Sequence, residues 1–199
     1  MPEARTLAET LPIHGRGQVG TPWWGLLCLI ATEGSIFAYL IFAYAYLGSQ
    51  GAGSWPPNGP PDLSLALPAT ILLIGSSFVL EWGKRAANRG SRRCGLIGVG
   101  GAFLMGGAFL LLELYEWSTK PFAFTDNSYS SMYFMLTGTH LLHVVVGLFA
   151  LFILFLWTLV GRVHGAHIQH RALATLYWHF VDVVWLFVFT TIYLSPRLT

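Results

Sequence analysis

The sequence predicts an all-α fold, a polytopic membrane protein built as a bundle of five transmembrane helices. The first observation is composition, because the 199 residues are 54% hydrophobic and 15% aromatic but only 10% charged. Soluble domains carry about 25% charged residues, so this composition argues against a water-soluble domain. The second observation is that five apolar segments are long enough to cross a bilayer, which takes about 20 helical residues. The third is that His179 and Asp182 lie inside the last apolar segment.

The five predicted spans are joined by connections that contain proline, glycine or charged residues. They cover residues 23–47, 63–82, 94–116, 129–160 and 172–194. The fourth span is longer than a bilayer requires, so we expect its ends in the interface or in water. Residues 1–22 have no apolar core and are followed by no cleavage site, unlike a signal peptide. We therefore expect a retained tail, residues 1–22, ahead of one transmembrane domain, residues 23–199.

Lysine and arginine residues predict the orientation of the bundle. Nine of the eleven fall in the tail, the second loop and the fourth loop, namely Arg5, Arg16, Lys84, Arg85, Arg89, Arg92, Arg93, Arg162 and Arg171. Only Lys120 and Arg197 lie on the other side. The positive-inside rule then predicts a cytoplasmic N-terminus and a C-terminus outside. The net charge of +2 reflects this topology and does not indicate nucleic-acid binding.

The cysteines and the glycine-rich stretches exclude several kinds of site. Cys28 lies within the first span and Cys94 at the cytoplasmic start of the third, so we expect no disulfide. No C-x-x-C-H motif for a c-type haem is present, nor a cysteine pair spaced for zinc or dinuclear copper. A Walker loop and a G-x-G-x-x-G motif after a strand are also missing from the sequence. We therefore predict no metal site in this chain.

Three polar residues fall at similar depth in three different spans. Glu33 lies roughly 15 Å into the first span, His143 about 16 Å from the outer end of the fourth, and Asp182 about 15 Å from the inner end of the fifth. Ionisable residues in spans are costly and usually face a protein interior. We predict a buried polar network of Glu33, His143 and Asp182, with two alternatives left open. Each residue bonds a neighbouring hydroxyl or carbonyl separately, or the three form a proton relay.

Other polar residues give further predictions. His140 and His143 share one helix at i, i+3, so they cannot ligate one haem iron from opposite sides. Glu113 and Glu116 lie in the last turn of the third span, where nothing else suggests hydrolytic chemistry. His164, His167 and His170 occur every third residue in the fourth loop, either as a proton-collecting surface or as a solvated loop.

Small residues in the third span predict close helix packing. Gly98, Ala102 and Gly106 recur at four-residue spacing. This pattern lets two helices approach closely, so we expect tight contact with a neighbour in this chain or in another.

Several motifs together resemble one family. The strongest is YWHFVDVVWLF at residues 177–187, and the second is TGTHLLHVVVG at residues 137–147. Trp-Pro-Pro at residues 55–57, Leu67-Pro68, Glu33 and Glu116-Trp117 add to the pattern. With these residues the chain resembles subunit III of the haem-copper terminal oxidases, the cytochrome c oxidase type, in its short five-helix bacterial form.

The chain also departs from the pattern of this family. Glu113 stands where many members have Gln, and Ala172 stands where long-form members have a carboxylate. The two N-terminal helices of the seven-helix form have no counterpart, so lipid contacts made by those helices cannot be carried over.

The resemblance implies a non-catalytic subunit of a proton-pumping oxygen reductase of the aerobic respiratory chain. Such a subunit packs on the catalytic haem-copper subunit I, alongside subunit II and other oxidase subunits, holds phospholipids, and supports proton uptake and complex stability. It binds no cofactor itself except structural phospholipid, since haem and copper reside in partner subunits. We expect His140, Trp178, His179 and Glu116 to orient helices or contact lipid. The implied location is a bacterial inner membrane.

Three alternatives remain from the sequence. The same fold serves quinol oxidases as subunit III, and a similar protein occurs with nitric oxide reductases. A b-type cytochrome membrane anchor would carry its own haem. A small transporter would act without partners and would be expected to have discontinuous helices.

Overall fold

The computed structural model describes residues 21–50, 55–57, 59–161 and 167–198, and within these ranges it contains helices and no strand. The five long helices are α2 (Thr21–Gln50), α3 (Leu63–Asn88), α4 (Arg92–Thr119), α5 (Ser128–Leu159) and α6 (His167–Phe189). Each span, the last measured as Gln169–Arg197, is long and apolar enough to cross a membrane. The prediction of an all-α, five-span fold is confirmed, whereas the predicted tail falls almost entirely outside the described residues.

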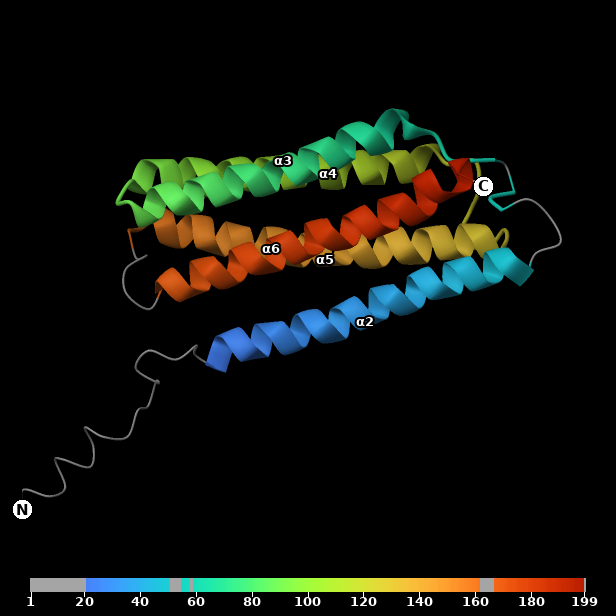
Figure 1. Cartoon of the computed structure of the whole chain (residues 1–199). Coiled ribbons are helices and arrows are strands. Elements are labelled where there is room, and N and C mark those ends of the chain that lie inside the picture. Colours follow the sequence, from blue (N-terminus) through green and yellow to red (C-terminus); the bar gives the residue numbers. More distant parts are fainter. Residues whose placement is uncertain (1–20, 51–54, 58, 162–166, 199) are drawn as a thin grey trace, which may run out of the picture.

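The helices lie side by side with their axes roughly aligned (Figure 1). α3 packs against α4 and α6, α5 packs against α4 and α6, and α2 packs along α5 and α6. The α3–α4 connection and the first turns of α2 and α6 share one end of the bundle (Figure 1). We call it the basic end, since it carries Lys84, Arg85, Arg89, Arg92 and Arg93. The opposite end holds the α4–α5 connection and the end of α6 (Figure 1).

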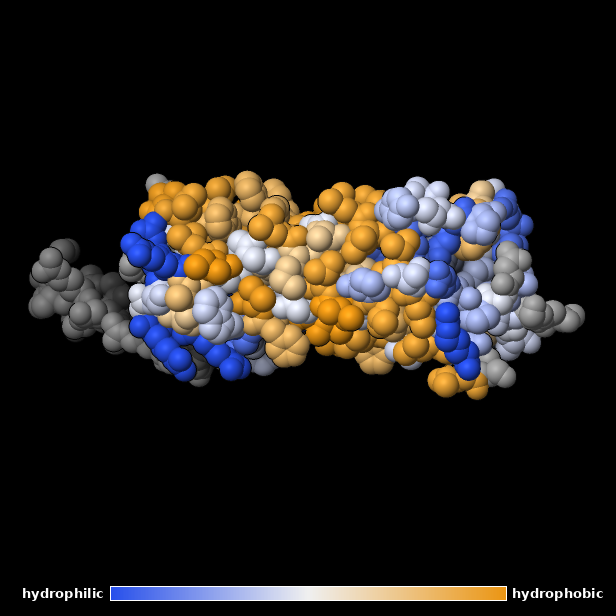
Figure 2. Space-filling view, turned by 90° about the horizontal axis from the view of Figure 1, so that it is seen from above, coloured by the Kyte–Doolittle hydropathy of each residue, from blue (hydrophilic) through white to orange (hydrophobic). Residues whose placement is uncertain are grey.

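The surface of the molecule matches a membrane environment. An apolar band covers the middle of the bundle and hydrophilic residues cover both ends (Figure 2). Phe78 on α3 and Leu104 on α4 are 74% and 71% exposed in the isolated chain. In a bilayer such side chains meet hydrocarbon, where their exposure costs nothing, while the helices satisfy their own backbone groups.

Local interactions set the helix ends. The side chain of Asp62 accepts a hydrogen bond from the Ser64 backbone N–H at the start of α3, and Asn127 forms a reciprocal capping box with Ser130 at the start of α5. α3 continues six residues beyond the predicted end at residue 82. Glu81 pairs with Lys84 and Arg85 one turn later, which stabilises this charged extension as helix.

The start of α6 corrects one prediction. Residues 167–170 begin the helix, so the described part of the fourth loop is shorter than expected, and His167 and His170 are helical rather than part of a loop. The other end of α6 passes into a π-helical turn at Thr190–Leu194. Such turns rotate the side chains that follow relative to a regular helix.

The predicted close packing of small residues occurs within this chain. A Cβ on Gly98 of α4 would lie 2.4 Å from the Gly83 Cα of α3, closer than atoms can approach. One turn earlier on α4, a Cβ on Gly95 would lie 2.9 Å from the Ala87 Cβ. The two backbones therefore touch near the basic end, which only glycine permits.

Candidate functional site

A carboxyl–imidazole pair links α2 to α5. His143 Nε2 lies 2.8 Å from Glu33 Oε2, and His143 Nδ1 lies 2.7 Å from the carbonyl oxygen of Thr139 one turn earlier. The ring of Phe37 packs edge-on against His143 at 5.0 Å between centroids. Two of the three residues of the predicted network therefore meet at one depth.

The geometry of this pair fixes how many protons it carries. A carbonyl oxygen only accepts, so His143 Nδ1 carries a hydrogen and donates it to Thr139. The short contact from Nε2 to Glu33 then needs one further proton, either on the carboxyl or on the ring. Both arrangements leave the pair neutral overall, which is what a polar group within a span requires.

Asp182, the third residue of the predicted network, contacts a different helix. Its polar neighbour is Ser77 on α3, and its Oδ1 has no hydrogen-bond partner among the described residues. His179, one turn earlier on α6, places Nδ1 2.9 Å from Ser77 Oγ and Nε2 3.7 Å from Glu81 Oε2. The α6 surface that carries these residues packs on α3, whereas Glu33 and His143 join α2 to α5.

His140 occupies an aromatic enclosure in the centre of the bundle. The ring is fully buried and neither nitrogen has a partner among the described residues. It lies 4.9 Å from the Trp185 ring and edge-on to Phe109 at 5.9 Å, measured between centroids. Trp185 in turn donates a hydrogen bond from Nε1 to Thr70 Oγ1 on α3 at 2.9 Å. This histidine therefore packs as an aromatic ring where α4, α5 and α6 meet.

Trp178 connects four helices. Its indole is fully buried and donates a 2.8 Å hydrogen bond to Ser76 Oγ on α3. The ring lies against Gly106 of α4 and Gly147 of α5, where an added Cβ would come within 2.6 Å and 2.7 Å of ring atoms. Glycine is needed at both positions because the indole occupies the space of a side chain.

A second polar cluster lies toward the opposite end of the bundle. Glu116 Oε1 accepts a hydrogen bond from Tyr193 Oη at 2.7 Å and one from Tyr133 Oη at 3.2 Å. Lys120 Nζ lies 2.7 Å from the same oxygen and 5.1 Å from the centre of the Tyr133 ring. Three charge-assisted contacts on one buried carboxylate tie α4 and α5 to the π-helical end of α6.

The sequence indicates only part of this cluster. Lys120 could have been paired with Glu116 from their i, i+4 spacing, which places them on one helix face. The two tyrosines gave no such signal, because they lie 17 and 77 residues away in the sequence. Neighbouring Glu113 is fully buried, and neither of its carboxyl oxygens has a partner among the described residues.

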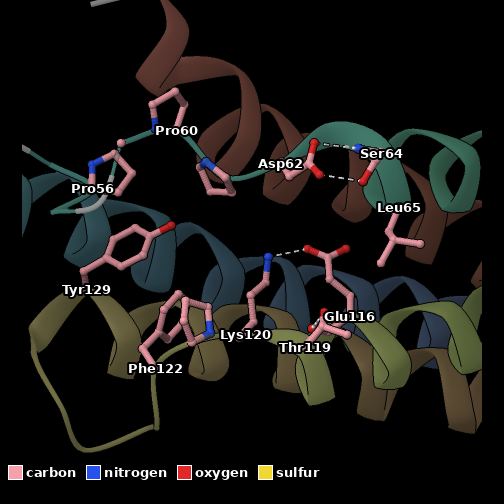
Figure 3. Close-up of a pocket in the computed structure, with 13 residues that line it drawn as sticks. Pro56, Pro60, Asp62, Ser64, Leu65, Glu116, Thr119, Lys120, Phe122 and Tyr129 are labelled. Atoms are coloured by element: carbon pink, nitrogen blue, oxygen red, sulfur yellow. Dashed lines mark hydrogen bonds and ion pairs between the residues drawn. The ribbon is translucent and has the colours of Figure 1, made fainter.

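A pocket of about 330 Å³ opens beside this cluster (Figure 3). Lys120 and Glu116 line one wall, and Asp62 and Ser64 line the other (Figure 3). Hydrogen bonds from the Ser64 hydroxyl and backbone N–H hold the pKa of Asp62 below its usual value. The pocket thus presents the ammonium group of Lys120 and the carboxylates of Glu116 and Asp62 at the end of the bundle.

An apolar groove of about 510 Å³ runs between α2 and α6. Its walls are made by small and aromatic side chains of both helices, namely Gly34, Phe37, Ala38, Ile41, Phe42, Ala45, Phe180, Val183, Val184 and Phe187.

The predicted proton-collecting histidines are described only in part. His164 and the side chain of His167 fall outside the described residues, and His170 is exposed with its ring 5.6 Å from that of Trp157. Within the described ranges no group of three or more His, Cys, Asp or Glu residues could hold a metal ion.

The fold and these clusters define an integral membrane protein, a five-helix bundle whose buried polar side chains connect helices to one another. Comparison with known proteins names the family. The chain belongs to the cytochrome c oxidase subunit III family, whose model matches residues 17–196.

Individual relatives align along most of their length. A cytochrome c oxidase subunit 3 from Synechocystis sp. is 38% identical over 193 residues, which cover 92% of this chain and 81% of the relative. A probable cytochrome c oxidase subunit 3 from Mycobacterium bovis is 34% identical over 195 residues, covering 94% of both chains. The insect protein from Anopheles gambiae is 32% identical over 179 residues, covering 85% of this chain and 68% of its own length.

Proposed function

We propose that the chain is a non-catalytic subunit III of a proton-pumping haem-copper oxygen reductase in an aerobic respiratory chain. The family match over residues 17–196 carries this proposal. The relatives are called cytochrome c oxidase subunits, which favours cytochrome c over quinol as the electron donor of the complex. Haem and copper are then held by partner subunits, with the catalytic subunit I as the main contact and subunit II in the same assembly.

We also propose a bacterial inner membrane with the basic end in the cytoplasm. Bacterial relatives and the concentration of lysine and arginine at one end of the bundle support this arrangement. Protons consumed by oxygen reduction then enter from the same side as the basic end. A role of this chain in sustaining their uptake fits that placement.

Polar side chains that bond across helix interfaces serve to fix the bundle. Glu33 with His143 joins α2 to α5, His179 with Ser77 joins α6 to α3, and Glu116 with its tyrosines joins α4, α5 and α6. Hydrogen bonds between helices resist separation in lipid, where no water competes for them.

The groove between α2 and α6 is the proposed place for a structural phospholipid. On α2 its lining runs from Gly34 to Ala45, about 16 Å along the helix axis. Half of a hydrocarbon core is about 15 Å thick, so the groove is as long as one acyl chain in one leaflet. None of the side chains that line it is polar, so nothing there would contact a headgroup and an acyl chain is the occupant that fits.

The lipid proposal is tested by filling the groove. Ala38→Phe places a ring inside it, and Ala31→Phe adds the same ring on an exposed part of α2 that does not line it. We expect Ala38→Phe, and not Ala31→Phe, to lower the phospholipid that co-purifies with the chain, measured by lipid mass spectrometry. Equal lipid content in both variants contradicts the assignment of this groove.

Affinity purification of the chain from its native membrane in mild detergent tests the function. We expect a large catalytic subunit by mass spectrometry and haem bands in the optical spectrum, with the haem type and any copper-bearing subunit indicating the donor. A chain that purifies alone and without haem overturns the oxidase proposal. A chain that purifies alone with its own haem favours a b-type cytochrome anchor instead.

A further inference from the structure

A line of polar side chains leads from the basic end of the bundle into the α3–α6 interface. It consists of Glu81 and Ser77 on α3 and His179 and Asp182 on α6, which we call the α3–α6 polar chain. Glu81 Oε2 lies 3.7 Å from His179 Nε2, and His179 Nδ1 lies 2.9 Å from Ser77 Oγ. Asp182 lies one turn beyond His179 on α6 and has Ser77 as its polar neighbour. The first three members are therefore linked by direct contacts, and Asp182 follows them on the same helix as His179.

The outer member of the chain is connected to the polar surface. Glu81 is 25% exposed and is held by Lys84 Nζ at 2.5 Å and by Arg85 Nε at 2.9 Å. Its carboxylate thus contacts cations at the polar surface on one side and lies beside the imidazole of His179 on the other. The His179 side chain is 37% exposed beside it.

The inner member ends in the protein interior. Asp182 is 6% exposed, and its Oδ1 has no partner among the described residues. Lys84 and Glu81 of α3 are the charged groups that act on His179, while Ser77 is the group that acts on Asp182. Glu33 of α2 and His143 of α5 bond each other. Burying an unpaired charge costs more than burying a neutral polar group, so this position suits a carboxyl that also carries a proton.

We propose that Asp182 is a proton store that exchanges with the basic end of the bundle through Ser77, His179 and Glu81. A proton from water arrives at Glu81 and protonates His179 Nε2. The imidazolium releases its Nδ1 proton to Ser77 Oγ while the serine hydroxyl proton moves to the Asp182 carboxylate. The step moves one proton inward and leaves a neutral imidazole, and its reversal returns the proton to the same end.

This inference deepens the proposed function. The role of the exchange in proton uptake rests on the proposal that the chain belongs to an oxidase. The exchange itself is a property of this chain. It can therefore be measured on the full-length chain in lipid nanodiscs, whatever the outcome of the purification experiment.

Isotope-edited infrared spectroscopy measures the exchange directly. The chain has three aspartates, and Asp62 and Asp126 are exposed, so a protonated-carboxyl band that shifts with carbon-13 aspartate labelling reports Asp182. Loss of the band in Asp182→Asn verifies this assignment. Transfer from H2O to D2O then gives the rate of exchange.

We expect Ser77→Ala to slow the exchange at least about tenfold, equivalent to about 1.4 kcal/mol in the barrier. His179→Phe should act in the same direction, and Ser77→Thr should restore the rate because it keeps a hydroxyl. Ser76→Ala is the matched control, since the Ser76 hydroxyl bonds Trp178 and the Leu73 carbonyl and is no member of the chain.

Two results overturn the proposal. One is an exchange rate in folded Ser77→Ala and His179→Phe equal to that of Ser76→Ala. The other is the absence of any Asp182-dependent protonated band between pH 5 and 9, since Asp182 would then never store a proton.

Discussion

At the scale of single residues, side chains within the spans hold one another in place through hydrogen bonds. His143 donates from Nδ1 to its own helix and meets Glu33 with Nε2, so the ring orientation is fixed from two directions. Truncating one partner leaves a polar atom without a hydrogen bond in a low-dielectric setting. The free-energy cost of that unsatisfied atom is larger than the net contribution of the hydrogen bond to stability.

Glu33→Ala tests this pair. We expect the free energy of unfolding to fall by about 1–3 kcal/mol, because His143 Nε2 loses its partner. Glu33→Gln should cost less, since an amide still bonds the ring. Thermal unfolding of the full chain in mild detergent measures both. Ser35→Ala is the control, because the exposed Ser35 hydroxyl bonds only the Ala31 carbonyl of its own helix.

Lys120 and Glu116 give a second prediction at this scale. Lys120→Met should lower the free energy of unfolding by about 1–3 kcal/mol, because the Glu116 carboxylate keeps two tyrosine donors but loses its cation. Combining it with Glu116→Gln should recover part of the loss, since the unpaired charge is gone.

Arg85→Gln is the control for Lys120→Met, because it removes a cation from an exposed ion pair. Arg85 is 70% exposed, and exposed ion pairs are worth about 0–1 kcal/mol. Lys120→Met and Arg85→Gln with equal effects on thermal unfolding would show that burial of the Glu116 cluster adds nothing.

At the scale of elements, close backbone contact between α3 and α4 depends on glycine. Gly98→Ala should destabilise the chain strongly or prevent folding, since its Cβ would overlap the Gly83 backbone, which cannot rotate away. Gly107→Ala on the same helix meets nothing within 4 Å and should be neutral or stabilising by up to about 1 kcal/mol through helix propensity.

Yield and thermal unfolding of the two glycine variants measure the difference. Both add one methyl group to α4, so the change in propensity is the same. Equal behaviour of the two would mean that the helices separate at this point without cost.

At the scale of the whole molecule, lysine and arginine residues are concentrated at one end of the bundle, and this predicts its orientation in the membrane. The basic end should face the cytoplasm, so alkaline phosphatase fused after residue 199 should be active and a fluorescent protein at the same place should be dark. Replacing Lys84, Arg85, Arg89, Arg92 and Arg93 by glutamine should reduce this preference, because these cations lie beside two spans. The opposite reporter pattern in the unmodified chain contradicts the assigned orientation.

The sequence by itself determined the class of fold and the location of the spans. Hydrophobic length and the sparse charges decide where a helix crosses lipid, and neither depends on what the helix packs against. Hydrophobicity did not fix the span ends, because α3 extends into a charged turn that i, i+3 and i, i+4 ion pairs hold helical, and α6 begins five residues before the apolar run. The small residues on α4 likewise predicted a close contact, though not that its partner is Gly83.

The tertiary structure decided which polar groups meet. Depth along the helix placed Glu33, His143 and Asp182 at one level, but the rotation of α6 turns Asp182 toward Ser77 on α3. The same packing brings Tyr133 and Tyr193 to Glu116. Depth follows from counting residues at a fixed rise, whereas the direction of a side chain around its helix depends on the neighbours that the whole bundle selects.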